Sequence, residues 1–346
     1  MQILLVRLSS MGDLLHSLPA LTDAARALPN ATFDWLTDEA FAQIPKWHSS
    51  LGSVIPVPSY PFGGGRISSA IRSRHPRGFL RTLRKKHYDL IIDLQGEWKS
   101  ALAARFAKGP VAGYDSASIH EWGAQFFYGK RFHVTKEQHS IQRMRSLVAQ
   151  ALGYAVPADM QYGIDTSRLP EVASFVDKPY LVFIHSTSWE SKCWPEVYWQ
   201  QLVSDALDNG FSIVLPWGTD AERDRAARIA GGSERVAILP KLSISEKAAV
   251  IAGAEGTVGL DTGLSHIAAA LGIPSVTLYG ATDPELIGAS GKNQIQIASQ
   301  FVCVKCHQSR CDYRGEYKMK PACFEMIHPS DVWSALIRLM KQAQVV

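Results

Sequence analysis

Short apolar segments alternate with amphipathic helical stretches along almost the whole chain. The segment QILLV at 2–6 is followed by a small polar turn and then by leucines spaced as on one face of a helix. The same alternation continues after DLIIDL at 89–94, LVFIH at 181–185 and GTVGL at 256–260. Strands that alternate with helices in this way predict parallel sheets covered by helices, which is the α/β class.

A polar stretch with prolines at 157, 170 and 179 divides this pattern into two halves. Hydrophobic periodicity fades across the stretch, which is typical of a linker. The length of 346 residues also suits two domains of ordinary size. We expect a first domain at 1–158, a linker at 159–178, a second domain at 179–328 and a last amphipathic helix at 329–346.

Composition indicates the class of protein and where in the cell we expect it. Hydrophobic residues make up 46% and charged residues 20%, the balance of a folded globular protein. No apolar run approaches the ~18 residues of a membrane span, and the first residues do not resemble a signal peptide. We therefore expect a cytoplasmic protein.

One basic segment differs from the rest of the chain, whose formal net charge is only +4. Between 66 and 86 it contains eight basic residues and no acidic one. Such a segment favours polyanions, whether a nucleic acid, a membrane surface or a phosphorylated substrate, and a solvated basic face is an equally good interpretation. Its members are Arg66, Arg72, Arg74, Arg77, Arg81, Arg84, Lys85 and Lys86.

Two polar loops in the second half are candidate phosphate sites. The sequence DTGLSH at 261–266 follows a predicted strand and begins a predicted helix, whose free N–H groups can bind phosphate while Asp261 holds a sugar hydroxyl. Lys192, with Thr187 and Ser188, follows another strand and offers an ammonium and two hydroxyls to a diphosphate. The turn YGATDP at 279–284 lines the same crevice if the strands are neighbours. A helix cap and an exposed loop lysine are the simpler alternatives.

Asp13 is a candidate general base in the first half. It lies just after the first predicted strand, at the start of a helix, and ligands of open α/β sheets bind at the carboxyl ends of strands. An acidic residue that only stabilises the helix N-terminus is the alternative. The chain has no GxGxxG after a strand, no GxxxxGK[ST], no HExxH and no GxSxG, which disfavours a dehydrogenase, a P-loop NTPase, a zincin and a serine hydrolase.

Four of the five cysteines form a cluster with the spacing C-x2-C-x4-C-x11-C. In a reducing cytoplasm, close cysteines suggest a structural metal, zinc first and iron second. Two disulfides or free thiols are the alternatives, and His307 could replace one ligand. The cluster comprises Cys303, Cys306, Cys311 and Cys323.

Taken together, these sequences resemble glycosyltransferase family 9, the ADP-heptose glycosyltransferases of lipopolysaccharide inner-core synthesis. The resemblance rests in the first half on LLVRLSSMGDLLHSLPAL at the start, FDWLTDEAFAQIP at 33–45 and YDLIIDLQGEWKSA at 88–101. In the second half it rests on HSTSWESKCWPEVYW at 185–199, LPWGTDAER at 215–223 and DTGLSHIAAALGIPSVTLYGATDP at 261–284. Among family members, the chain is most similar to those that add the first heptose to the Kdo residue of Kdo-lipid A.

The resemblance implies a GT-B fold, in which two Rossmann-like domains face each other across a central cleft. The first domain would bind the acceptor, the second the donor, and the last helix would pack back toward the first domain. Asp13 would be the general base. The donor set implied by the resemblance is Thr187, Ser188 and Lys192 near the diphosphate, Asp261 near the heptose, Thr262, Gly263 and Leu264 at the phosphates, Glu222 at the ribose, Leu242 beside the adenine, and His266 in the same motif.

The function implied is inverting transfer of L-glycero-D-manno-heptose from ADP-heptose to Kdo-lipid A, without a cofactor required for catalysis. Lys192 would stabilise the departing ADP, and the basic segment with Lys99 would hold the anionic acceptor, Arg66, Arg72 and Arg74 being the candidates within it. The chain departs from its relatives at PFGGGRISSAIRSR and in the four-cysteine segment. A family 9 transferase with another acceptor, such as a protein side chain or another core oligosaccharide, is therefore the main alternative.

Two other function classes remain as alternatives. A nucleic-acid binder would use the basic segment, but Phe79 is the only aromatic residue interleaved with its cations, so base stacking is poorly served, and we expect no nucleic acid as a partner. A GT-B sugar-nucleotide epimerase would consume a nucleotide sugar without an acceptor. For the transferase, we expect contact with the inner face of the membrane that carries its lipid-linked acceptor.

Overall fold

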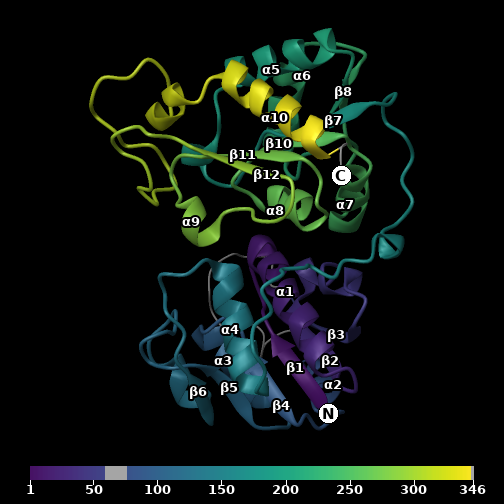
Figure 1. The fold of residues 1–346 in the computed structure, drawn as a ribbon, viewed down its shortest axis with the longest axis vertical. Helices are drawn as coiled ribbons and strands as arrows, with labels where there is room; N and C mark the ends of the chain where they lie inside the picture. The colour runs from purple at the N-terminus through teal and green to yellow at the C-terminus, as the bar shows by residue number, and fades with distance from the viewer. Residues whose placement is uncertain (59–75, 344–346) are drawn as a thin grey trace. The chain divides into compact units, whose positions relative to one another are not determined.

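The computed structural model describes residues 1–58 and 76–343, shown in Figure 1 as two compact units. Unit 1 is Met1–Arg168 and unit 2 is Leu169–Val346. Each is an α/β unit built on a six-stranded parallel sheet, as the alternating pattern predicted.

Unit 1 has the strand order β3-β2-β1-β4-β5-β6, so its first strand lies in the middle of the sheet. Four of the five residues of β1 are fully buried, which is why QILLV reads as an uninterrupted apolar run. The strands are β1 (Gln2–Val6), β2 (Thr32–Asp38), β3 (Leu51–Val57), β4 (Leu90–Asp93), β5 (Val111–Tyr114) and β6 (Lys130–Phe132). The helices are α1 (Met11–Ala27), α2 (Pro76–Leu83), α3 (Trp98–Phe106) and α4 (Ser140–Leu152).

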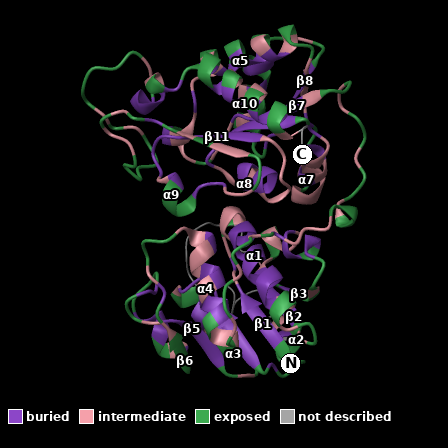
Figure 2. Cartoon of the chain, in the orientation of Figure 1, coloured by how far each residue is buried: buried purple, intermediate pink, exposed green. Residues whose placement is uncertain are grey.

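Unit 2 repeats the architecture with the order β12-β11-β10-β7-β8-β9. Its central strands are buried throughout, and exposed residues lie on the outer sides of the helices (Figure 2). The strands are β7 (Tyr180–Ile184), β8 (Ser212–Leu215), β9 (Val236–Ile238), β10 (Gly256–Leu260), β11 (Ser275–Tyr279) and β12 (Gln294–Ala298). The helices are α5 (Glu196–Asp208), α6 (Asp220–Ala230), α7 (Ile244–Ala252), α8 (Gly263–Ala270), α9 (Pro284–Ile287) and α10 (Pro329–Ala343).

Aromatic side chains anchor the core of unit 2. Trp194 and Trp199 are fully buried with their rings edge to face at 5.1 Å, and Phe183 of β7 packs against Trp199 at 5.7 Å. The indole N–H of Trp194 donates to the carbonyl of Ile327, so the loop before α5 is fixed to the segment before α10. Rings of this size contribute most of the burial energy of a core, and the polar edge of Trp194 is satisfied.

The first ten residues of the predicted linker pack within unit 1. Arg145 is buried, forms an ion pair with the buried Asp23 at 2.6 Å and donates to the carbonyl of Asp159 at 2.8 Å. Arg168 donates to the carbonyls of His48 at 2.7 Å and Ser49 at 3.1 Å. The boundary after Arg168 therefore falls inside the predicted linker at 159–178 rather than at its start.

The last helix, α10, packs on its own unit. Its main contacts are with α5 and with β10, β11 and β12 of unit 2. Val332, Leu336 and Met340 enter the core of that unit, which explains the amphipathic pattern of the helix. The expected packing of 329–346 toward the first domain stays a prediction.

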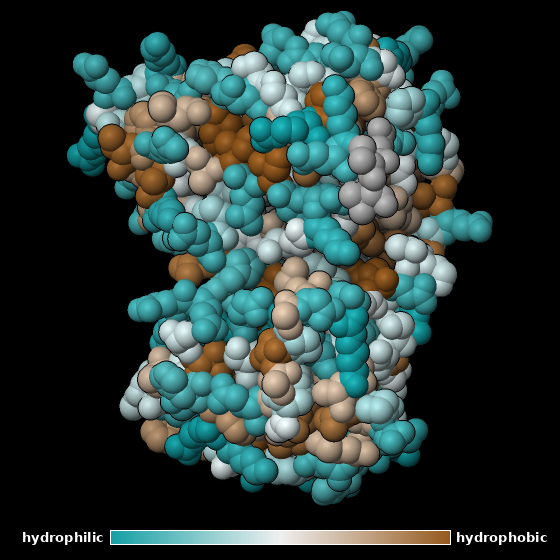
Figure 3. Space-filling model, in the orientation of Figure 1, coloured by the Kyte–Doolittle hydropathy of each residue, from teal (hydrophilic) through white to brown (hydrophobic). Residues whose placement is uncertain are grey.

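Hydrophilic residues cover most of the surface drawn in Figure 3, with apolar areas between them. Within residues 1–58 and 76–343, no helix is long and apolar enough to cross a membrane.

Candidate active site

In unit 2, polar loops follow three neighbouring strands at the same edge of the sheet. Strand β10 pairs with β7 on one side and β11 on the other, all in parallel, so their carboxyl ends meet. Thr187, Ser188 and Lys192 follow β7, Asp261 follows β10, and Thr282 follows β11. The topology thus brings together loops that are about 70 and 20 residues apart in the sequence.

Asp261 is the centre of this cluster. One oxygen, Oδ2, accepts from Lys192 Nζ at 2.7 Å and from Thr282 Oγ1 at 2.6 Å. The other, Oδ1, lies 3.7 Å from Nε2 of His266, one turn into α8. Thr187 adds a hydrogen bond from its hydroxyl to the Asp261 carbonyl at 3.4 Å. The predicted residues Thr187, Lys192, Asp261 and His266 therefore form one contiguous site.

The charges of the site are held in a largely water-free environment. The Asp261 side chain is only 6% exposed and that of Lys192 is 15% exposed. Burial by itself raises the pKa of Asp261, but the His266 hydrogen bond and the Lys192 ammonium outweigh it and hold the pKa well below its usual range. Lys192 Nζ also lies 4.4 Å from the centre of the Trp189 ring, a cation–π contact that fixes the ammonium on its second side.

The helix start at α8 has the geometry of an anion site. Thr262 is its N-cap residue in an extended conformation, and its hydroxyl makes no capping bond to the helix. Gly263 and Leu264 lie in the first turn, whose N–H groups have no partners inside a helix. Thr262, Gly263, Leu264 and Ser188 are all at least partly exposed, as groups that contact a ligand must be.

Two further predicted donor contacts lie in the segments that follow the neighbouring strands β8 and β9 of the same sheet. Glu222 is in the first turn of α6, where its Oε2 accepts from the N–H groups of Gly218 at 2.6 Å and Thr219 at 3.1 Å. Leu242 is half-buried in the loop between β9 and α7. Glu222 thus has a structural role as a capping residue, and its contact with a ribose stays a prediction.

A segment after β12 joins the two loops that hold Asp261. The N–H groups of Lys305 and His307 donate to the carbonyls of Gly280 at 2.9 Å and Ala281 at 2.8 Å, beside Thr282. On the other side, Ser191 donates from its N–H to the Ser309 carbonyl at 3.2 Å and from its hydroxyl to the Gln308 carbonyl. We call residues 305–309 the brace, because they connect the neighbours of Thr282 to the neighbours of Lys192.

Sequence reasoning placed the turn at 279–284 near the site but gave no role to Thr282, Ser191 or the brace. The ion pair between Lys305 Nζ and Asp283 Oδ2, at 2.9 Å, also went unpredicted. No local pattern signals these contacts, since the partners are between about 20 and 120 residues apart.

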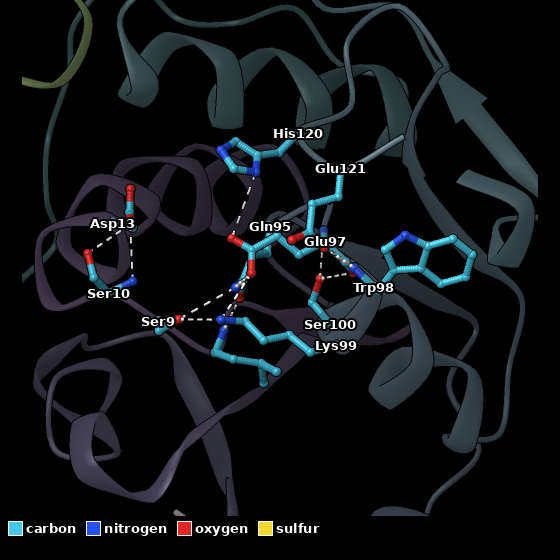
Figure 4. Close-up of polar contacts among 12 residues, drawn as sticks. Ser9, Ser10, Asp13, Gln95, Glu97, Trp98, Lys99, Ser100, His120 and Glu121 are labelled. Atoms are coloured by element: carbon cyan, nitrogen blue, oxygen red, sulfur yellow. Dashed lines mark hydrogen bonds and ion pairs between the residues drawn. The ribbon is translucent and has the colours of Figure 1, made fainter. Parts of the chain in front are cut away.

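In unit 1, the loop after β1 holds the carboxylate of Asp13 (Figure 4). Its Oδ2 accepts from the N–H of Ser10 at 3.0 Å and from the Ser10 hydroxyl at 2.8 Å, and it pairs with Arg7 at 2.8 Å. Within the described residues, all of the hydrogen bonds and ion pairs of this carboxylate use Oδ2. The side chain is 31% exposed, so a substrate hydroxyl can reach the carboxylate.

The Asp13 carboxylate is ionised at neutral pH. Burial raises its pKa, but the Arg7 guanidinium and the Ser10 hydrogen bonds lower it by more, so the pKa lies well below its usual range. Asp13 also has a structural role at the start of the helix, because it lies in the first turn of α1 and accepts from the N-cap residue Ser10. That role occupies one oxygen and does not exclude a catalytic role for the other.

Lys99 lies in the first turn of α3, the helix that follows the adjacent strand β4. Its Nζ donates to the Ser9 hydroxyl at 3.2 Å and pairs with Glu97 Oε2 at 3.0 Å. Gln95 connects the same loops, since it accepts from the N–H of Leu8 at 2.8 Å and donates to Glu97 at 2.8 Å. The Lys99 ammonium is thereby placed beside the loop that leads into α1 and Asp13, at the carboxyl edge of the sheet (Figure 4).

A fully buried carboxylate shapes this second loop. Asp93, at the end of β4, accepts from Ser100 Oγ at 2.8 Å, from Tyr128 at 2.7 Å and from the N–H of Gln95 at 2.9 Å. Burial raises the pKa of Asp93, and these donors oppose the shift. Asp93 therefore fixes the loop from inside without facing a substrate.

The other predicted acceptor residues, Arg66, Arg72 and Arg74, lie outside the described residues. The described end of the basic segment is largely exposed, including Arg81, Arg84 and Lys85, while Lys86 forms an ion pair with Asp34 at 2.7 Å.

The four clustered cysteines lie in unit 2 as free thiols, so the disulfide alternative is wrong for this structure. Burial and then the charges of the Cys303, Cys311 and Cys306 thiols raise the pKa of Cys323 to about 12. Across the described ranges, however, no three Cys, His, Asp or Glu side chains are arranged to hold a metal ion.

Comparisons with known proteins agree on one family. The family model described as glycosyltransferase family 9 (heptosyltransferase) matches residues 77–316. Lipopolysaccharide heptosyltransferase 1 of Pseudomonas aeruginosa is 43% identical over 347 residues, covering 97% of this chain and 97% of that protein.

Solved structures give the same result for the fold. The structure of E. coli heptosyltransferase WaaC with ADP is similar with a TM-score of 0.84 and 39% identity, over 98% of this chain and 100% of that one. The structure of the same enzyme with ADP-2-deoxy-2-fluoro heptose is similar with a TM-score of 0.78 and 37% identity, over 99% and 100%. The two parallel six-stranded sheets are those of a GT-B fold, which confirms the predicted fold class.

Proposed function

The chain belongs to glycosyltransferase family 9, and we propose that it transfers L-glycero-D-manno-heptose from ADP-heptose to the Kdo residue of Kdo-lipid A. It is a glycosyltransferase of the heptosyltransferase I type, acting in lipopolysaccharide inner-core biosynthesis. The observation that carries the donor half is the buried Asp261–Lys192–Thr282 cluster at the ends of three adjacent strands. The similar E. coli enzyme was solved with ADP and with an ADP-heptose analogue, which supports the same donor class here.

Charge development explains what the donor site would do. When the bond between the anomeric carbon and the diphosphate oxygen breaks, both electrons stay with ADP, which gains negative charge. The Lys192 ammonium and the helix start at Thr262 would stabilise that charge, because both are fixed before the reaction. Asp261 keeps the ammonium in position and offers a carboxylate oxygen to a sugar hydroxyl.

We assign the general base to Asp13. Its carboxylate would take the proton of the acceptor hydroxyl while the hydroxyl oxygen attacks the anomeric carbon on the face opposite to ADP, which inverts the configuration. The lowered pKa of Asp13 makes it a weak base. Proton transfer would then come late, when the new bond has already made the hydroxyl proton strongly acidic.

The acceptor is the finer part of this proposal. Lys99, 46% exposed beside Ser9, is a described cation available to a carboxylate or phosphate of Kdo-lipid A. Arg66, Arg72 and Arg74 would extend that charge. Such an acceptor is anionic and lipid-linked, so we place the enzyme at the cytoplasmic face of the inner membrane. The transfer assay must distinguish Kdo-lipid A from the other acceptors that a family 9 enzyme could use.

We propose that catalysis requires no metal or other cofactor, because Lys192 and a helix start supply the positive charge at the leaving group. A structural zinc or iron at Cys303, Cys306, Cys311 and Cys323 remains a separate proposal, which the described side-chain arrangement does not support. Metal analysis of the purified protein tests it. A stoichiometric metal that is lost on replacing Cys306 by Ser would establish the site.

The direct test is incubation with ADP-heptose and Kdo2-lipid A, read by mass spectrometry. The proposal requires one added heptose on the lipid and release of ADP. Transfer to a peptide or another core oligosaccharide, with none to Kdo2-lipid A, would replace the acceptor. ADP-heptose consumed without any acceptor would replace the reaction class.

Asp13→Ala tests the base. We expect turnover to fall by about 10³-fold or more while ADP binding stays near normal, because general base catalysis contributes 10²–10⁴-fold and Asp13 is in the other unit from the ADP site. Asp159→Asn is the control, since it removes an exposed carboxylate of the same unit that we do not assign to proton transfer. Near-normal turnover of Asp13→Ala would remove Asp13 from this role.

A further inference from the structure

Unit 1 exposes a group of aromatic side chains that the proposed reaction does not use. Trp122 is 72% exposed, Phe126 64% and Trp98 45%. Single exposed apolar residues are normal on protein surfaces, but large ones in mutual contact mark a binding surface. We call Trp98, Trp122, Phe126 and Phe127 the aromatic patch.

The patch is an ordered unit. The Trp122 and Phe126 rings meet edge to face at 5.8 Å, and the Trp98 and Phe127 rings do so at 5.5 Å. Gly123 joins the two pairs: its φ is +97°, and a Cβ there would lie 2.5 Å from Cζ2 of Trp98. The backbone of the loop therefore lies directly against the Trp98 ring.

The aromatic patch lies next to Lys99, the candidate acceptor-binding residue. Trp98 directly precedes Lys99, and its N–H donates to Glu121 Oε2 at 2.8 Å, while the N–H of Glu121 donates to Gly96 at 3.0 Å. These loops follow β4 and β5, at the same sheet edge as Asp13. Figure 4 shows the Trp98 ring directed away from Ser9 and Lys99.

The rings lie in a mildly basic part of the chain. Residues 97–131 carry five Lys and Arg against three Asp and Glu. Arg131 lies with its guanidinium carbon 6.0 Å from the Phe126 ring centre, next to the exposed Lys130. Two carboxylates adjoin the rings in the chain: Glu97 pairs with Lys99 at 3.0 Å, and Glu121 accepts from the N–H of Trp98 at 2.8 Å. Exposed Trp and Phe with flanking Lys and Arg are the composition of an interfacial membrane contact.

The size of the patch favours a bilayer over a protein. A full aromatic side chain presents about 150–250 Å², so these exposed fractions leave roughly 400 Å². A stable protein interface needs about 800 Å² from each partner. A bilayer requires less apolar area, because a few inserted rings act together with attraction between basic residues and anionic headgroups.

We propose that the aromatic patch docks unit 1 on an anionic phospholipid bilayer, with Trp122 and Phe126 at headgroup depth and Lys130 and Arg131 on lipid phosphates. The inference rests on the proposed function in one respect: a lipid-linked acceptor is itself held at that surface. Docking through loops that adjoin Lys99 would bring the acceptor site to the acceptor. No membrane-spanning helix is needed for this mode of binding.

Vesicle co-sedimentation tests the docking. The full chain is mixed with sucrose-loaded vesicles of phosphatidylethanolamine and phosphatidylglycerol, and separately with phosphatidylcholine vesicles. We expect binding to the anionic vesicles that weakens with salt, and little binding to the neutral ones. The double variant Trp122→Ala/Phe126→Ala should bind at least about tenfold more weakly, given the apolar area that it removes.

Two further variants make the result specific. Val197→Ala/Val302→Ala removes exposed apolar side chains from unit 2, where Val197 is 59% and Val302 82% exposed, and should bind like the parent chain. Lys130→Gln/Arg131→Gln leaves the rings intact and should abolish the preference for anionic vesicles. Equal vesicle binding by the aromatic variant and the parent, with unchanged thermal melting, would overturn the proposal. So would a parent chain that self-associates through these rings.

Activity separates docking from the reaction itself. The aromatic variant should transfer heptose normally to a deacylated, water-soluble acceptor and poorly to acceptor embedded in vesicles. Equal loss on both acceptors would show that the rings serve the active site and would overturn the docking role. If the parent chain transfers to neither acceptor, the proposed function fails while vesicle binding still decides the docking question.

Discussion

Replacing Lys192 by Met should leave the Asp261 carboxylate buried but without its ion pair to the Lys192 ammonium. Asp261 is 6% exposed and would keep only Thr282 and the more distant His266. Removing one partner of a buried ion pair typically destabilises by 3–5 kcal/mol. The carboxylate can avoid part of this destabilisation by binding a proton. The expected loss in the free energy of unfolding therefore has an upper limit that depends on pH.

The limit follows from the ordinary Asp pKa of about 3.9. Protonating such a group takes about 4 kcal/mol at pH 7 and about 1.5 kcal/mol at pH 5. In the parent chain the pKa of Asp261 is lowered. The ion pair therefore contributes fully to stability above the ordinary Asp pKa, and that contribution is lost only as pH falls toward the pKa of the folded state. The loss in stability of the Lys192→Met variant should therefore shrink by up to about 3 kcal/mol between pH 7 and pH 5.

Calorimetric melting at both pH values measures this. A loss of about 4 kcal/mol corresponds to a lowering of Tm by about 8–16 °C for a unit of this size. Lys305→Met is the matched control, because Lys305 pairs with Asp283 at 2.9 Å in the same unit but is 42% exposed, so its loss should change Tm little at either pH. An equal Tm shift for Lys192→Met at pH 7 and pH 5, or one no larger than the control's, would refute the reasoning.

Three further changes probe the two halves of the proposed site. Thr282→Val should raise the donor KM by about 5–10-fold, since it removes one net hydrogen bond of about 1–1.5 kcal/mol to Asp261, and unchanged donor kinetics would count against the contact. Lys99→Ala should raise the acceptor KM at constant donor KM and constant Tm, which steady-state kinetics and a melt would show together. Ser191→Ala should weaken the brace by one hydrogen bond of about 1 kcal/mol and so raise the donor KM a few-fold; a lower Tm with normal donor KM would make the brace purely structural.

The central strands could be read from the sequence, whereas the edge strands β3, β6 and β12 could not. Strands β1, β4, β7, β10 and β11 are buried on both faces, so hydrophobicity alone marks them. Strand β3 lies at a sheet edge, includes exposed Gly52 and Pro56, and has no clear period. Strands at the edge are defined by the partner they pair with, which a local pattern does not contain.

The same division holds for the candidate site residues. Lys192 and Asp261 follow strands of one sheet, whose carboxyl ends share an edge, so their grouping in unit 2 could be expected from the order of motifs. Asp13 follows a strand of the other sheet, in unit 1. The sequence did not indicate that Thr282 shares Asp261 Oδ2 with Lys192, or that Lys99 meets Ser9. It also did not place the aromatic patch, whose members were unremarkable one at a time.

The sequence by itself determined the α/β class, the two-domain division and the family, because each depends on patterns that recur at short range or in a fixed order along the chain. Only the tertiary structure decided which side chains form hydrogen bonds or ion pairs with one another and which lie on the same surface. Those properties depend on distances of a few ångströms between residues that are far apart in the chain. The packing of α10 on unit 2 is one instance: its amphipathic pattern predicted a buried face but not the surface that would cover it.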